Sequence, residues 1–234
     1  MTNLKSSQGI VRRSIYVGLS KPKDPKKIGS ALIRFSEIPK SVFNPKTWFH
    51  VYKASHVFLA YPAHGWRPFY LVNEATGSGV RWVSEPFFAD HTCIVELYLF
   101  ELPIEHYRAV KNYGSMMSGA PYPWLENLGI AMQRLAKWFL RKDIINPFDN
   151  NARAIKCSEL FFRAFFNHRT DLDFMKIKED LWNLKGEYIS GDIDSLGVRD
   201  TELVLDWLCE QGYCVKARAI APIQNASGVS SLAS

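Results

Sequence analysis

The order of two hydrophobic patterns along the chain sets the strongest limit on its fold. Between residues 54 and 102, apolar residues alternate with polar ones or form short blocks between turn-forming residues, which is typical of β-strands. After Pro103, apolar residues recur at helical spacing. Because strands come first and helices follow, the sequence predicts an α+β fold in which an antiparallel β-sheet or barrel packs against helices.

The same patterns predict individual elements. We expect strands over 30–38, 55–61, 69–76, 80–88 and 93–102, and helices over 103–117, 124–142, 157–168 and 200–212. In the last helix, Asp200 or Thr201 is the expected N-cap and Gly212 the stop. Residues 1–28 are expected to form a polar N-terminal arm. The expected domain spans 29–222, with helical additions after 103 and after 167, and 223–234 form a flexible tail.

Composition narrows the choice of partners. The chain has 234 residues, of which 47% are hydrophobic, enough for one substantial core. The net charge of +6 is compatible with an anionic partner, but the basic residues are scattered, so we do not expect nucleic-acid binding. No stretch approaches the roughly 20 apolar residues of a membrane span, and no signal peptide is visible. We therefore expect a protein that is cytoplasmic as synthesised. It could then be carried in a virion or released by cell lysis.

The four cysteines give no sign of a metal centre. Cys209 and Cys214 are close in sequence but lack the second pair that a zinc site needs. Cys93 begins an apolar strand-like run and is expected in the core. We expect no metal and no cofactor.

Cys157 stands apart because it directly precedes an apolar helical run, "SELFFRAF". Packing is one explanation, since free cysteine is among the most buried residue types. Chemistry is the other, since a helix N-terminus lowers the pKa of a thiol and makes it a better nucleophile. Ser158 and Glu159 suit the first turn of such a helix.

A nucleophilic thiol needs a base, and the base needs an orienting group. His56 lies on an expected strand, and Glu74 ends the next one, so a hairpin could place them side by side. Asn73 would point to the opposite face, so only one of the two can orient His56. His91, in an expected loop, is a rival base.

Three motifs in this order resemble the circularly permuted, YiiX-like NlpC-type branch of the papain-like cysteine peptidases and amidases. The resemblance covers about residues 28–166. The matching positions lie on a histidine strand, on a strand that ends in Glu-Ala before glycines, and at the start of a cysteine helix. They are Ser55, His56, Val57, Glu74, Ala75, Gly77, Gly79, Val80, Cys157, Ser158, Glu159 and Leu160.

The resemblance implies a permuted papain-like fold with the nucleophile at a helix N-terminus. It implies Cys157 as nucleophile, His56 as general base and Glu74 as orienting group. Tyr122, Ser55 and Ser158 are the implied substrate-binding residues. The chain departs from the family at Pro123, which replaces an acid after the tyrosine.

The expected function is a thiol hydrolase that cleaves an amide bond, with cell-wall peptide as the implied substrate class. One alternative is an acyltransferase or lipid esterase with the same triad, with which the clustered Phe161, Phe162, Phe165 and Phe166 are compatible. The other is a non-catalytic structural or binding module on the same fold, such as a component of a phage particle. The additions after 103 and 167 would then bind protein partners.

Overall fold

The computed structural model describes residues 11–24, 53–63, 69–123, 154–167, 172–186 and 196–218, with the single residues 129, 132, 136, 140 and 189. In chain order the elements are β1 (Arg12–Pro22), β2 (His56–Ala63), β3 (Phe69–Thr76), β4 (Gly79–Ser84), α2 (Glu85–His91), β5 (Thr92–Pro103), α3 (Ile104–Met116), α5 (Cys157–Phe166), α6 (Phe174–Lys185), α7 (Val198–Glu210) and β6 (Val215–Lys216). The expected strand over 30–38, the expected helix over 124–142 and the expected tail lie outside the described residues or largely so.

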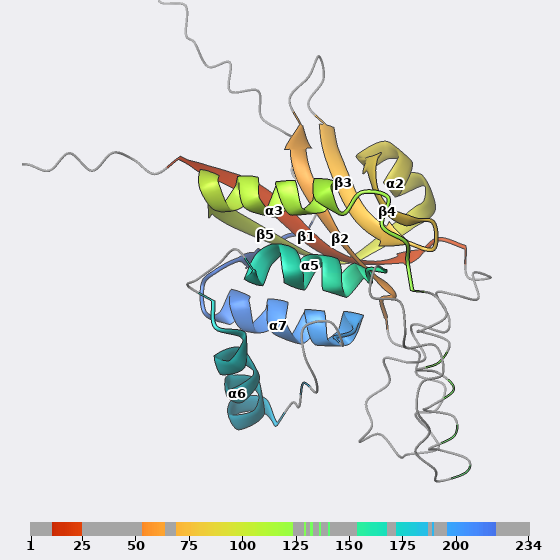
Figure 1. Cartoon of the computed structure of the whole chain (residues 1–234). Coiled ribbons are helices and arrows are strands. Elements are labelled where there is room, and N and C mark those ends of the chain that lie inside the picture. Colours follow the sequence, from red (N-terminus) through yellow and green to blue (C-terminus); the bar gives the residue numbers. More distant parts are fainter. Residues whose placement is uncertain are drawn as a thin grey trace, which may run out of the picture.

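The strands form one antiparallel sheet in the order β4-β3-β2-β1-β5-β6. The two edge strands, β4 and β6, do not pair with each other, so the described strands make an open sheet and not a closed barrel. The α+β class is therefore confirmed, and the barrel alternative is wrong for this part of the chain. In Figure 1, α3 and α5 lie against the sheet, α7 lies beyond α5, and α6 lies beyond α7.

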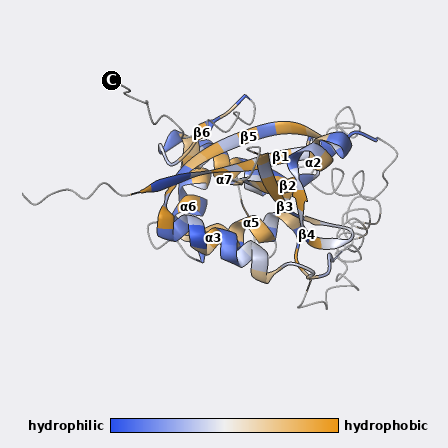
Figure 2. Cartoon of the chain, turned by 90° about the horizontal axis from the view of Figure 1, so that it is seen from above, coloured by the Kyte–Doolittle hydropathy of each residue, from blue (hydrophilic) through white to orange (hydrophobic). Residues whose placement is uncertain are grey.

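Both faces of the sheet are covered. On one face, α5 packs against β2 and β3, and α7 packs behind α5 (Figure 1). On the other face, Phe88 of α2 packs with Tyr16, Phe58 and Leu97. In Figure 2, α5 is mostly hydrophobic and α3 mostly hydrophilic, as expected for an inner and an outer helix. Phe161, Phe162 and Phe165 of α5 are completely buried in the core.

The N-terminal region differs most from expectation. Residues Arg12–Pro22, expected within a polar arm, form β1 near the middle of the sheet, paired with β2 and β5. Its stretch Ile15–Ser20 is buried, with alternate residues entering the cores on the two faces. A strand that is buried on both faces has a short apolar run in place of alternating apolar and polar residues. Because polar residues flank this run, the sequence pattern did not predict the strand.

Several boundaries also differ. The expected strand over 80–88 ends at Ser84, and α2 follows, because Pro86 suits the first turn of a helix and cannot donate to a sheet ladder. Helix α7 begins at Val198 with Gly197 as N-cap, and the Asp200 carboxylate accepts a hydrogen bond from the Gly197 N–H at 3.0 Å. Sequence analysis did not predict α6 as a separate helix.

Candidate functional site

The candidate site begins with two neighbouring strands. In the β2–β3 pairing, Phe58 lies directly opposite Glu74, and His56 lies two residues from Phe58. His56 and Glu74 are therefore diagonal neighbours that project from the same face. Nε2 of His56 lies 2.9 Å from Oε2 of Glu74. Glu74 is thus the hydrogen-bond partner of the histidine, and Asn73 lies on the opposite face, under Gly114 of α3.

Cys157 lies about 100 residues after His56 in the sequence. It is the first residue of α5, which contacts both β2 and β3. Its thiol interacts with the His56 side chain, and this interaction helps to raise the pKa of the imidazole. Because Nε2 already faces Glu74, Nδ1 is the ring nitrogen left for the thiol. The structure therefore brings Cys157, His56 and Glu74 together.

The interactions within the site shift the pKa values of both His56 and Glu74. Burial lowers the pKa of His56, but hydrogen bonds with Cys157 and Glu74, and the attraction of both, outweigh it and raise this pKa to about 10. Burial raises the pKa of Glu74, but hydrogen bonds from His56 and Arg81 outweigh it and lower the pKa below its ordinary value. Both shifts favour the charged forms, an imidazolium next to an ionised carboxylate.

Arg81 is a member of the site that sequence analysis missed. Its Nε and Nη2 donate to Oε1 of Glu74 at 2.9 and 2.8 Å, so the other carboxylate oxygen is left for His56. A signal was present in the sequence. The two-residue turn at Gly77 and Ser78 places Arg81 directly opposite Glu74 in the β3–β4 hairpin.

Of the two glycines in the motif, Gly77 and Gly79, only Gly79 occupies a position that requires glycine. Its φ of 101° lies in a region that other residues rarely adopt, and a Cβ there would lie 2.6 Å from the Ala120 carbonyl oxygen. The Val80 N–H donates to that same oxygen at 2.8 Å, so the segment around residue 120 docks on β4. Gly77 has no neighbour within 4 Å and shows no such need.

Of the expected substrate-binding residues, Tyr122 lies on a segment whose backbone bonds to the residues just before Cys157. It is half-buried against the core, and the preceding Pro121 carbonyl accepts a hydrogen bond from the N–H of Ile155, two residues before Cys157. Ser55 is buried beside His56, and its N–H donates to the Ser20 carbonyl oxygen at 2.9 Å.

The residue Ser158 has a different role from the one expected. Its hydroxyl is buried and donates to the Leu196 carbonyl oxygen at 2.6 Å, which ties α5 to the start of α7. That bond uses the hydroxyl hydrogen, so the buried side chain has no hydrogen left to donate to a substrate. Ser158 is not the helix cap either. The N-cap is Lys156, whose N–H donates to the Glu159 carboxylate at 3.3 Å.

The residue Ser20 adds a polar group next to the histidine. It pairs with His56 across β1 and β2 and is completely buried. Its hydroxyl has no hydrogen-bond partner among the described residues. A buried hydroxyl without a partner costs roughly 1–3 kcal/mol, so this position suits a water molecule or a polar atom of a ligand.

Other features of the molecule do not extend the site. The rival base His91 ends α2, where its Nδ1 bonds the Phe87 carbonyl oxygen at 2.9 Å.

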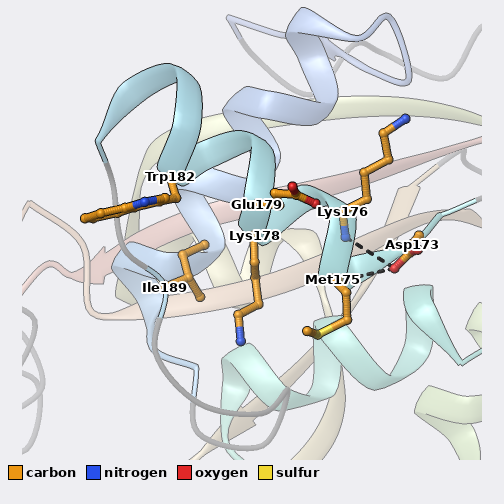
Figure 3. Close-up of a pocket in the computed structure, with 7 residues that line it drawn as sticks. All are labelled: Asp173, Met175, Lys176, Lys178, Glu179, Trp182 and Ile189. Atoms are coloured by element: carbon orange, nitrogen blue, oxygen red, sulfur yellow. Dashed lines mark hydrogen bonds between the residues drawn. The ribbon is translucent and has the colours of Figure 1, made fainter.

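A surface cavity of about 540 Å³ lies on α6, lined by residues such as Asp173, Lys178 and Trp182 (Figure 3). None of the three clustered side chains lines that cavity. Within the described ranges, no group of acidic, histidine and cysteine side chains could hold a metal ion.

Comparisons with protein-family models, curated proteins and solved structures found no match to this chain. In the part of the chain that the structure describes, no helix is both long enough and apolar enough to cross a membrane.

Proposed function

We propose that this protein is a thiol hydrolase that cleaves an amide bond through an acyl-enzyme on Cys157. The observation that carries the proposal is the series of interacting side chains Cys157, His56 and Glu74, with the cysteine at the first position of a helix. A nucleophile, a base and an orienting group in that order form the arrangement used in nucleophilic catalysis. Within this proposal, the fold is of the permuted papain-like type, because the histidine strand precedes the cysteine helix.

Each residue has a defined chemical role in the proposed reaction. The Cys157 sulfur, having given its proton to His56, attacks the carbonyl carbon of the amide. The carbonyl oxygen gains negative charge, which backbone N–H groups at the start of α5 can stabilise. The imidazolium of His56 then donates its proton to the leaving amine as the C–N bond breaks.

The second half of the reaction restores the enzyme. His56, now neutral, takes a proton from a water molecule, which attacks the acyl carbon and releases Cys157. Throughout, the ionised Glu74 accepts the Nε2–H hydrogen bond and stabilises the charged form of His56. Arg81 holds the other oxygen of Glu74 and so positions that carboxylate.

We propose cell-wall peptide as the substrate class, on the resemblance of the three motifs alone. The lipid alternative loses three of the four residues that favoured it, because Phe161, Phe162 and Phe165 are completely buried in the core and cannot line an open site. The proposal of a non-catalytic module predicts the same fold without turnover.

The test is to incubate the full chain with soluble cell-wall peptides and, separately, with a lipid ester, and to quantify new amine and fatty-acid ends. We expect new amines with the wild type and none with Cys157→Ala. Fatty-acid release alone would favour the lipid esterase. Equal amine release by both proteins would overturn the assignment of the nucleophile.

A further inference from the structure

Two cysteines outside the candidate site lie in contact at the end of α7. The Sγ atoms of Cys209 and Cys214 are 2.6 Å apart, and both residues are free thiols. Cys209 lies in the last turn of α7, and Cys214 directly precedes β6. The separation is only about half an ångström longer than the ~2.05 Å of a disulfide bond.

The backbone between the two cysteines produces this contact. Gly212 adopts a φ of 79°, the left-handed conformation that ends many helices. The N–H of Tyr213 then bonds back to the Leu208 carbonyl oxygen at 2.9 Å, which reverses the chain. Cys214 is thereby folded against α7, where its thiol lies 3.7 Å from the Leu205 carbonyl oxygen. The turn thus presents the two sulfurs to each other before any bond forms.

We propose that Cys209 and Cys214 form a site of reversible disulfide formation. Cys209 is the partly exposed member, so it meets the oxidant first. Its thiolate attacks one sulfur of a small-molecule disulfide such as glutathione disulfide, and one glutathione thiolate leaves. Cys214 then loses its proton and attacks the Cys209 sulfur, which releases the second glutathione. Two thiol protons and two electrons pass to the oxidant.

The disulfide joins two elements that already meet through polar contacts. Val215 and Lys216 pair with β5, and Nζ of Lys216 lies 2.9 Å from the Asp206 carboxylate of α7. A bond between Cys209 and Cys214 makes this junction covalent. It therefore fixes the end of α7 against the edge of the sheet.

The test uses the unmodified full-length chain with glutathione disulfide. Burial raises the pKa of both thiols, so the reaction is run at mildly alkaline pH. Remaining thiols are alkylated after unfolding. Both cysteines fall in one tryptic peptide, 200–216. We expect that peptide to lose the mass of two hydrogen atoms and to regain it with a reductant, while Cys93 is alkylated.

Two controls sharpen the result. The Cys214→Ser variant is expected to end with one glutathione on Cys209, because no second thiol is present to displace it. The Cys157→Ala variant is expected to form the disulfide like the wild type, which separates this site from the proposed hydrolase. A wild-type peptide 200–216 that carries two alkyl groups, or two glutathione adducts, would overturn the proposal.

Discussion

The Glu74 carboxylate divides its two oxygens between two partners. One oxygen faces Nε2 of His56 and the other accepts two N–H groups from Arg81. Such a division fixes the rotation of the carboxylate, because either partner alone would leave it free to turn. Arg81 also stacks over the Phe87 ring at 5.6 Å, which restricts the guanidinium.

This arrangement predicts the effect of removing the arginine. In Arg81→Met, the pKa of Glu74 should rise, because Arg81 lowers it in the native protein. We expect the rate of Cys157 labelling by a thiol-reactive acyl probe to fall about tenfold, the equivalent of one weakened charge-assisted hydrogen bond. The acid limb of the rate profile should also move to higher pH.

Two control variants accompany this measurement. Arg81→Lys keeps the charge but loses the paired donors, so partial recovery of the rate is expected. Arg108→Met changes an exposed arginine on α3 and should leave the rate and its pH profile unchanged. A normal profile in Arg81→Met would show that Arg81 does not position Glu74.

The histidine also makes stability depend on pH. Its pKa is raised from 6.5 to about 10 in the folded chain. A raised pKa stabilises the fold fully below pH 6.5, and this stabilisation is lost as pH rises toward 10. The free energy of unfolding of the wild type minus that of His56→Gln should therefore be largest at low pH and shrink over this range in urea titrations. A difference that grows with pH would contradict the assignment.

At the scale of elements, α5 and α7 are linked through a buried hydrogen bond. Ser158, next to the candidate nucleophile, donates to the Leu196 carbonyl oxygen at 2.6 Å. The bond fixes the first turn of α5, and with it the position of Cys157, relative to the residues that lead into α7. Ser158 is therefore expected to matter for stability and not for contact with substrate.

Removing this hydroxyl leaves a buried carbonyl oxygen without its partner. We expect Ser158→Ala to lower the free energy of unfolding by about 1–3 kcal/mol. The matched control is Ser115→Ala, because the Ser115 hydroxyl also bonds a backbone carbonyl, that of Lys111 at 3.1 Å, but at an exposed site. Its effect should stay within about 0.5 kcal/mol. Equal effects in urea unfolding would refute the role of Ser158.

The strand β1 depends on one glycine. A Cβ at Gly18 would lie 2.1 Å from the Phe58 ring, which is completely buried. We expect Gly18→Ala to cost about 1–3 kcal/mol of unfolding free energy through overpacking. Gly77→Ala is the control, because nothing lies within 4 Å of a Cβ there. Similar thermal midpoints for the two variants would argue against this tight contact.

At the scale of the whole molecule, the sequence predicted the order of strands and helices but not how the sheet is completed. Strands β2, β3 and β5 and helices α3 and α5 carry clear periodic patterns, and the structure has them. The central strand β1 was missed because six buried residues between polar flanks carry no alternation. An open sheet and a barrel share one local pattern, so local sequence could not separate them.

Within the candidate site, the sequence predicted the pairing of His56 with Glu74 more readily than the other contacts. The hairpin of β2 and β3 brings His56 to Glu74 through short-range pairing, which sequence reasoning can follow. The contact with Cys157 spans about 100 residues, and motif order suggested it where periodicity could not. The hydrogen-bond partners of side chains were the least predictable feature of the site. Ser158 turned toward Leu196, and Arg81 took the second oxygen of Glu74, because side-chain partners depend on packing that periodicity does not encode.

The central claim, that Cys157 is a nucleophile activated by His56, is tested most directly by comparing two cysteines in one molecule. The measurement is the rate at which a thiol-reactive acyl probe labels Cys157 and Cys93, read by peptide mass spectrometry. Cys157 is only 3% exposed, and Cys93 is more accessible, so exposure alone favours Cys93. We predict that Cys157 reacts at least about tenfold faster in the wild type and loses this advantage in His56→Ala. Labelling of Cys157 no faster than that of Cys93, or unchanged by His56→Ala, would contradict the account.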